Sequence, residues 1–258
     1  MDILYIIGEG CSKCDNQELR YSLRSIERYG NGVSRVFVVG YCPEWLSDEV
    51  VKIPYEQPYK YVNSTEPNPE VRLAFKCNNI ISSVLYAVDN SDIGDDFLVS
   101  MDDHLYIKKV DFDNYPYYVR LQKNGSILIP EEGKSVYRKC IVNTGRILRE
   151  QGLSDYMLVM HRNMHCQRRV IEDCREFIEQ GIKDNLLLEY LLYMQNYQYT
   201  KYGFEMTQAR DVKIKNSGDW LRVRTMAVDV FSTADFVTSD RMNLLISNLY
   251  PKKSKYEK

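Results

Sequence analysis

The chain has 258 residues, of which 44% are hydrophobic and 27% are charged. Its 34 Lys and Arg residues nearly balance 36 Asp and Glu residues, which leaves a formal net charge of −2. A chain of this length can bury a large core, and its near-neutral charge excludes a global field that attracts nucleic acid or anionic membranes. An anionic substrate must therefore be held by local groups.

The N-terminal segment Met1–Gly8 carries an acid and a short apolar run. The run is too short for a signal peptide or a membrane span, so we expect a first buried strand and no membrane span. Seven scattered cysteines favour a reducing compartment and predict a cytoplasmic protein. Cys11 and Cys14 have the spacing of a zinc half-site, but no second pair follows at finger-like distance, so we predict no structural zinc.

The first half of the chain alternates predicted strands and helices. After a strand over 2–7 and a polar loop, apolar residues with a 3.6-residue period predict a helix over Glu18–Tyr29. Further on we predict strands over Val36–Gly40, Val50–Pro54 and Phe97–Met101, a loop over Gln57–Pro69 and a helix over Glu70–Val88. This order predicts an α/β fold with an open, mostly parallel sheet flanked by helices, which binds ligands at the carboxyl ends of its strands.

The second half is richer in predicted helix. We predict weaker strands over Tyr117–Leu121 and Ser126–Ile129, and helices over Tyr137–Glu150, Arg168–Ile182 and Asn185–Tyr197. No internal repeat and no linker is evident in the sequence. We therefore predict one domain over residues 1–258 with a helix-rich C-terminal part.

The acidic pair Asp102-Asp103 directly follows the apolar strand predicted over 97–101. Two carboxylates about 4 Å apart in a partly desolvated cleft repel by about 4 kcal/mol, so they share either a proton or a cation. Mg²⁺ or Mn²⁺ is the simpler answer, since both take carboxylate ligands together with substrate phosphates. Neighbouring strand residues point to opposite faces, so both acids reach one ion only if the chain turns there. A solvated turn is the alternative interpretation.

His161 and several cations are further candidates. His161 follows an apolar run and suits a third metal ligand or a general base, although a lone histidine there is more often a hydrogen-bonded core residue. Arg20 and Arg24 lie one turn apart near a predicted helix start, where backbone N–H groups also favour anions. The cations that could hold a diphosphate are Arg20, Arg24, Arg72, Lys76 and Lys253, with solvated helix-face charges as the alternative.

Several other classes of function lack their motifs. The sequence has neither a glycine-rich phosphate loop nor a Gly-x-Ser-x-Gly elbow, which removes the main support for P-loop kinases, dinucleotide-binding dehydrogenases and common α/β hydrolases. Aromatic and basic residues interleave over 197–224, a pattern that suits single-stranded nucleic acid or a glycan. Because the chain has no net positive charge, we expect nucleic acid only as an acceptor.

Several stretches together resemble Stealth-type capsular polysaccharide transferases and related bacterial and bacteriophage glycosyltransferase-like proteins. Their order and rough spacing agree over nearly the whole chain. The segment Asn16–Ile26 resembles the block "NDELRYSLRSI" of these proteins. The other matching segments are Pro43–Leu46 with "PxWL", Phe97–Leu105 with "FLxxNDDxF", His161 with "DxHxP", and Phe231–Thr233 with Pro251–Glu257 for the closing "FPxKSxFE".

The resemblance implies a glycosyltransferase A-type (GT-A) fold, a UDP- or GDP-sugar donor and a divalent metal, Mn²⁺ or Mg²⁺. It assigns the metal to Asp102 and Asp103 with His161 as a further ligand, and it gives Asp103 and His161 the catalytic roles. The donor-binding residues that it implies are Asn16, Arg20, Arg24, Lys76, Asn79 and Asp102. The chain departs from the family pattern at Met101, which replaces the Asn before the acidic pair, and at Val159 and Asn163 around the histidine.

These observations predict a metal-dependent glycosyltransferase that moves a sugar from a nucleotide-diphosphate sugar to a glycan, a polymer or a modified base. Residues 1–125 are expected to bind the nucleotide sugar, and residues 126–258 to form the acceptor half. Three alternatives stay open: transfer of sugar 1-phosphate, a catalytically silent binding or virion-associated protein with the same fold, and nucleic-acid binding.

Overall fold

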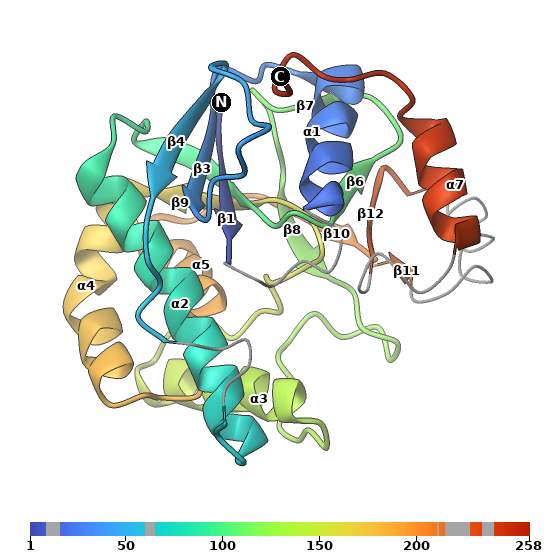
Figure 1. The fold of residues 1–258 in the computed structure, drawn as a ribbon. Helices are drawn as coiled ribbons and strands as arrows, with labels where there is room; N and C mark the ends of the chain where they lie inside the picture. The colour runs from blue at the N-terminus through green and yellow to red at the C-terminus, as the bar shows by residue number, and fades with distance from the viewer. Residues whose placement is uncertain (9–15, 60–64, 211, 215–227, 234–239) are drawn as a thin grey trace.

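The computed structural model describes residues 1–8, 16–59, 65–210, 212–214, 228–233 and 240–258. Within these residues the main sheet has five strands in the order β4-β3-β1-β5-β9 (Figure 1). The strands are β1 (Asp2–Ile7), β3 (Val36–Gly40), β4 (Val50–Pro54), β5 (Asp96–Ser100) and β9 (Met164–Gln167). The first four run parallel, and β9 pairs antiparallel with β5 at the edge. The predicted α/β fold with a mostly parallel sheet is confirmed.

The central strands form because their side chains are apolar on both faces. Every residue of β1 and β3 is buried, as expected for parallel strands that are covered on both sides. Tyr5 in β1 pairs with Val38 of β3 and with Ser100 of β5, which sets the register of the sheet. Gly40 ends β3 with φ +98°, and a Cβ there would lie 2.1 Å from the Ile7 carbonyl oxygen. Only glycine fits this close approach.

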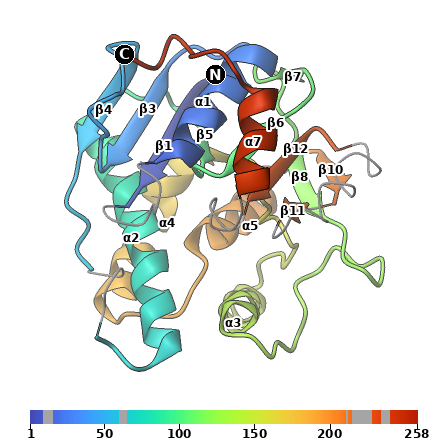
Figure 2. The ribbon, with the colours of Figure 1, turned by 45° about the vertical axis from the view of Figure 1, so that its right-hand side comes forward.

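Helices cover both faces of the sheet (Figures 1 and 2). Leu4 and Ile6 of β1 pack into one hydrophobic cluster with α2, α3, α4 and α5, whereas Tyr5 packs into a second cluster with α1. This alternation follows from the two-residue period of a strand. The helices are α1 (Gln17–Tyr29), α2 (Pro69–Asn90), α3 (Val136–Glu150), α4 (Arg168–Lys183), α5 (Tyr190–Tyr202) and α7 (Asp240–Leu249).

Shorter strands extend the molecule beyond the main sheet. The strand β6 directly follows the acidic pair and pairs antiparallel with β12, which comes from near the C-terminus. The short strands are β2 (Gly30–Asn31), β6 (His104–Tyr106), β7 (Val110–Asp111), β8 (Tyr117–Arg120), β10 (Met206–Ala209), β11 (Lys213–Ile214) and β12 (Val230–Thr233). In the described residues β11 pairs with β12, β10 with β8, and β2 with β7. Segments distant in sequence are thereby placed beside the acidic pair.

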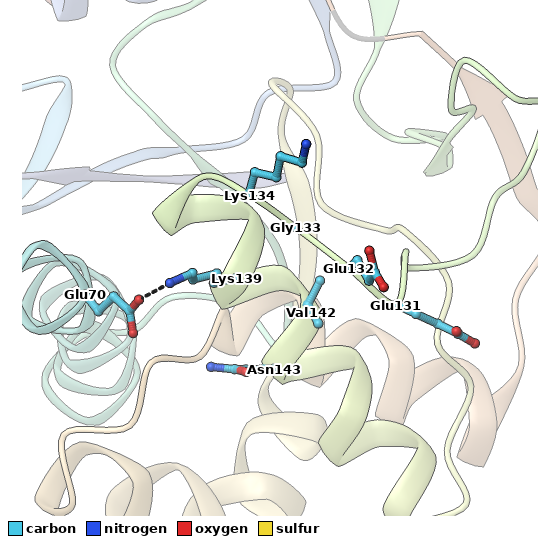
Figure 3. Close-up of a pocket in the computed structure, with 8 residues that line it drawn as sticks. All are labelled: Glu70, Glu131, Glu132, Gly133, Lys134, Lys139, Val142 and Asn143. Atoms are coloured by element: carbon cyan, nitrogen blue, oxygen red, sulfur yellow. Dashed lines mark hydrogen bonds and ion pairs between the residues drawn. The ribbon is translucent and has the colours of Figure 1, made fainter.

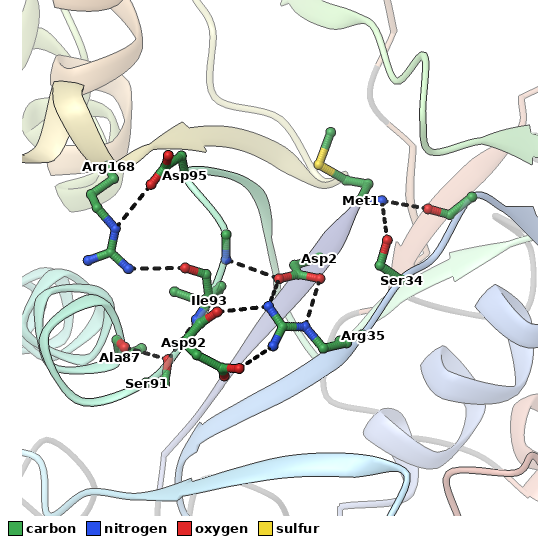
Figure 4. A network of polar contacts seen from close by, with 12 residues as sticks. Met1, Asp2, Ser34, Arg35, Ala87, Ser91, Asp92, Ile93, Asp95 and Arg168 are labelled. Atoms are coloured by element: carbon green, nitrogen blue, oxygen red, sulfur yellow. Dashed lines mark hydrogen bonds and ion pairs between the residues drawn. The ribbon is translucent and has the colours of Figure 1, made fainter.

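A network of ion pairs joins the amino ends of the central strands (Figure 4). The Arg35 guanidinium lies 2.7 Å from Asp2 Oδ2 and 2.6 Å from Asp92 Oδ2. The Gly94 N–H donates to the same Asp2 carboxylate at 3.0 Å. These contacts fix the amino ends of the central strands, whereas Asp102 and Asp103 lie at the opposite, carboxyl ends.

Two predicted elements of the second half differ from the structure. The strand predicted over Ser126–Ile129 is wrong, because only Leu128 forms a bridge, to Tyr156. A turn before it reverses the chain, and Gly125 in this turn has φ +81°. The helix predicted over Asn185–Tyr197 begins at Tyr190 instead, because Asn185 adopts a left-handed conformation with φ 51°.

The remaining predicted strands and helices match the observed ones to within about two residues at each end. Residues 60–64 of the loop predicted over Gln57–Pro69 lie outside the described residues. Cys11 and Cys14 lie outside the described residues, as do residues 211 and 215–224 of the interleaved aromatic and basic stretch. In the described part of the chain, no helix combines the length and apolar character needed to cross a membrane. The edge strand β9, from the predicted second half, pairs with β5 of the first half, and the larger hydrophobic cluster combines residues from both halves.

Candidate functional site

The acidic pair occupies a turn at the carboxyl end of β5. Asp102 and Asp103 form this turn, and the His104 N–H donates to the Met101 carbonyl oxygen at 3.4 Å. Both aspartates are half-buried. The turn removes the geometric objection to a shared role, because the two side chains are no longer fixed on opposite faces of a strand.

The Asp102 carboxyl lies among other acids. Burial raises its pKa to about 7, and the negative charges of Asp103 and Glu18 act in the same direction. Lys76 on α2 acts in the opposite direction. A cation placed beside these acids would offset both the burial of the Asp102 carboxylate and its repulsion by the neighbouring acids, and would therefore favour the ionised form.

Asp103 lies between two basic side chains. The Lys213 ammonium donates to Asp103 Oδ2 at 3.4 Å, and His104 Nε2 lies 3.7 Å from Oδ1. His104 is 2% exposed, and burial lowers the pKa of its imidazole. In the described part of the chain, its Nδ1 is buried without a hydrogen-bond partner. Lys213 therefore supplies the positive charge that balances Asp103.

His161 lies in the segment before β9, within electrostatic range of Asp103, His104 and Lys213. Burial lowers the pKa of its imidazole to about 3, and the positive charge of Lys213 adds to this effect. The ring is therefore neutral at physiological pH, which is the form that binds metals or accepts a proton. The structure thus brings Asp102, Asp103, His161 and Lys76 to the same edge of the sheet.

The side chains at the carboxyl ends of the strands offer ligand atoms that suit a divalent cation. Two carboxylates and a neutral imidazole are a ligand set that Mn²⁺ accepts. In the residues that the structure describes, no three His, Cys, Asp or Glu side chains already converge into a metal site. An ion bound by Asp103 would share this carboxylate with the Lys213 ammonium, which lies 3.4 Å from Oδ2.

The two arginines of α1 have structural partners. Arg24 Nε donates to Glu257 Oε1 at 2.7 Å, and Arg24 Nη2 donates to Glu257 Oε2 at 2.6 Å. Arg20 lies 3.5 Å from the same carboxylate and stacks over the Trp45 ring at 4.1 Å. Burial acts to raise the pKa of Glu257, but the hydrogen bonds from Arg24 hold it below its ordinary value. The donor-binding roles of Arg20 and Arg24 therefore rest on the resemblance and on their position near the start of α1.

The other predicted donor residues are occupied in different ways. The Asn79 side chain makes two hydrogen bonds to the Tyr59 backbone. Its Oδ1 accepts from the Tyr59 N–H at 3.0 Å, and its Nδ2 donates to the Tyr59 carbonyl oxygen at 2.7 Å. Asn16 is buried at the N-cap of α1 with φ 52°. Lys253 donates to the Lys258 carbonyl oxygen at 2.9 Å. Among the cations considered for the diphosphate, Lys76 acts on Asp102, because its positive charge lowers the pKa of that carboxyl.

Sequence reasoning missed three charged residues of this region. Glu18 lies within the block that carries the resemblance, but no local pattern marks it as a neighbour of Asp102. Lys213 reaches Asp103 from 110 positions away through the pairing of β11 with β12. Glu189 lies inside the helix predicted over 185–197, and it interacts with Lys76. Such long-range neighbours leave no periodic signal in the sequence.

A separate open pocket of about 400 Å³ lies between α2 and α3 (Figure 3). It is crossed by an ion pair in which Lys139 Nζ lies 2.6 Å from Glu70 Oε1. The lining residues are Glu70, Glu131, Glu132, Gly133, Lys134, Lys139, Val142 and Asn143. None of the predicted site residues lines this pocket, so it is distinct from the edge that carries the acidic pair.

No protein-family model and no curated protein matches the sequence. Among solved structures, an active-site mutant of LgtC matches with a TM-score of 0.51 and 14% identity, covering 99% of this chain and 97% of that chain. The galactosyltransferase LgtC in complex with donor and acceptor sugar analogues matches over the same shares, with a TM-score of 0.50 and 14% identity. The likeness spans both chains almost completely. The chain therefore has a GT-A-like glycosyltransferase fold.

Proposed function

We propose that the chain is a metal-dependent glycosyltransferase that transfers a sugar from a nucleotide-diphosphate sugar to a hydroxyl acceptor. The observation that carries the proposal is the half-buried Asp102, which lies at a strand end beside Asp103, Glu18 and Lys76. Ligands of open parallel sheets bind at this edge. LgtC, which shares the fold, is a galactosyltransferase whose structure was solved with donor and acceptor sugar analogues.

In this proposal Asp102, Asp103 and His161 hold Mn²⁺ or Mg²⁺. The bound ion supplies positive charge that stabilises the leaving diphosphate. The charge of Lys76 acts on Asp102, and in this proposal Lys76 adds a second positive charge near the diphosphate. His161 keeps its imidazole neutral because of its burial and the nearby Lys213.

The acidic pair also suits transfer of sugar 1-phosphate, in which the same ion assists at phosphorus. The products separate the two reactions, since release of UDP or GDP identifies glycosyl transfer and release of UMP or GMP identifies phosphosugar transfer. We propose glycosyl transfer because two structures that share the fold are those of LgtC, a galactosyltransferase.

The experiment that tests the proposal is a thermal-unfolding screen with UDP-glucose, UDP-galactose, UDP-N-acetylglucosamine and GDP-mannose, each with and without Mn²⁺. A donor at one hundred times its dissociation constant adds about 2.7 kcal/mol to the free energy of unfolding. We expect at least one nucleotide sugar to raise the melting temperature only when Mn²⁺ is present. An unchanged melting temperature with every donor would contradict the proposal.

A further inference from the structure

A small cavity of about 10 Å³ lies where β8, β9 and α5 meet. Tyr118 of β8, His165 of β9 and Gln195 of α5 line it, together with Arg162 and Asn163 from the segment just before β9. This volume is about the space that one water molecule needs. Because the cavity admits only one molecule of that size, the groups that line it surround a single point.

The Asn163 side chain is used by the fold at one end only. Asn163 is 2% exposed, and its Oδ1 accepts from Ser100 Oγ at 2.9 Å. Ser100 is the last residue of β5, the strand that leads to Asp102. In the described part of the chain, Asn163 Nδ2 is buried without a hydrogen-bond partner. The amide therefore holds the end of β5 through its oxygen and leaves its N–H groups unpaired beside the cavity.

The neighbouring Arg162 shows the same pattern. It is 4% exposed, and its guanidinium lies over the Tyr118 ring, 4.0 Å from the ring centre. Its two terminal nitrogens donate to the Asp229 carboxylate at 3.4 and 3.2 Å. Among the described residues, its Nε is buried and has no hydrogen-bond partner. Two buried donors on consecutive residues thus lack partners beside one cavity, although such groups are normally satisfied by protein or by ordered water.

Charge and size decide which ligand fits. Asp229 balances the charge of Arg162, so the pair offers no excess positive charge to hold a buried anion. Chloride is also larger than the water molecule that the cavity admits. A buried water makes two to four hydrogen bonds to groups that otherwise have no partner. The cavity therefore suits water, a neutral molecule that accepts from both donors.

We propose that one water molecule occupies this cavity as a fixed part of the fold and bridges Arg162 Nε and Asn163 Nδ2. It accepts from both N–H groups and donates to the side-chain amide oxygen of Gln195. The bridge completes a polar path from Arg162 to Ser100 and so holds the end of β5 from the side of β9. This inference does not depend on the proposed function.

The test is a crystal structure of the full chain at a resolution that shows ordered water, together with a second crystal soaked in sodium bromide. We expect one density peak within about 3.2 Å of both Arg162 Nε and Asn163 Nδ2, with no anomalous signal from bromide. An anomalous peak at this point would identify an anion. A well-ordered map without any peak would show a dry cavity, and either result would overturn the proposal.

A pair of variants tests the role of the amide. Asn163→Leu has a side chain of similar size without polar atoms and should lose the density peak, whereas Asn143→Leu on the outer part of α3 should keep it. A peak that persists in Asn163→Leu would show that the amide does not hold the water, and the proposal would fail.

A solution measurement on wild type decides the matter even if Asn163→Leu does not fold. In protein labelled with ¹⁵N, the Asn163 side-chain amide protons should show a nuclear Overhauser effect to water with the sign of a long-lived bound molecule. Such a water exchanges slowly because it is enclosed and makes several hydrogen bonds. An effect with the sign of freely diffusing water, or none, would contradict a fixed water at this position.

Discussion

The Lys213 ammonium lies 3.4 Å from Asp103 Oδ2 and places a positive charge beside one member of the acidic pair. Lys213 comes from β11, which reaches this edge only through its pairing with β12. A metal that binds Asp103 must therefore compete with a side chain of the same molecule. Lys213 is 32% exposed, so it can withdraw into solvent when an ion binds.

The first prediction concerns this competition. Lys213→Gln should bind Mn²⁺ about three- to tenfold more tightly than wild type, because it removes a like charge near the ion. Isothermal titration with Mn²⁺ measures the change. Lys201→Gln is the matched control, because Lys201 is an exposed lysine on α5. Equal or weaker affinity in Lys213→Gln would show that the ion does not bind beside Asp103.

A second prediction follows from the raised pKa of Asp102. A carboxyl whose pKa is higher in the folded state than in the unfolded state stabilises the fold at low pH, and this contribution is lost as pH rises through the folded value of about 7. Asp102→Asn should therefore raise the melting temperature by a few degrees at pH 8 without metal, and by less at pH 5. Asp48→Asn, which changes an almost fully exposed acid, should show no such dependence. A destabilised Asp102→Asn at pH 8 would contradict the assignment.

The third prediction separates a structural from a donor-binding role of Arg24. Arg24→Ala removes the bidentate partner of Glu257, whose side chain is 0% exposed, and should cost about 3 kcal/mol of stability. Arg146→Ala breaks an exposed pair on α3 and should cost well under 1 kcal/mol. Chemical denaturation measures both. Normal stability of Arg24→Ala with lost donor binding would return Arg24 to the donor pocket.

A fourth prediction tests the backbone beside the site. Gly40→Ala should destabilise the protein strongly, because φ is +98° and the new Cβ would lie 2.1 Å from the Ile7 carbonyl oxygen. The expected result is a melting temperature lower by many degrees, or a protein that does not fold. Gly125→Ala provides the comparison, because its φ is +81° but nothing lies within 4 Å of the added Cβ. Equal effects of the two substitutions would contradict the steric explanation.

The elements that could be predicted are those whose apolar residues form a local run or follow a local period. The apolar run before Asp102 predicts a buried strand, and β5 is that strand. The helical period from Leu19 onward predicts α1. The strand predicted at Ser126–Ile129 failed because a short apolar run after a polar turn pairs only at Leu128.

Contacts between distant residues could not be predicted, because no local period encodes them. The pairing of Arg24 with Glu257 spans 233 positions, and Lys213 reaches Asp103 across 110. The left-handed Asn185 likewise interrupts a pattern that reads as continuous helix. These contacts decide which predicted cations lie beside the acidic pair and which ones brace the C-terminal segment.

The most direct measurement is the change in melting temperature that a nucleotide sugar with Mn²⁺ causes in wild type and in a variant carrying both Asp102→Asn and Asp103→Asn. Asparagine keeps the volume of each side chain and removes its charge, so the fold should remain intact. The account predicts that Mn²⁺ and donor together stabilise wild type by several degrees and leave the double variant unchanged. Equal stabilisation of both proteins would place the metal and the donor away from this edge of the sheet and would contradict the account.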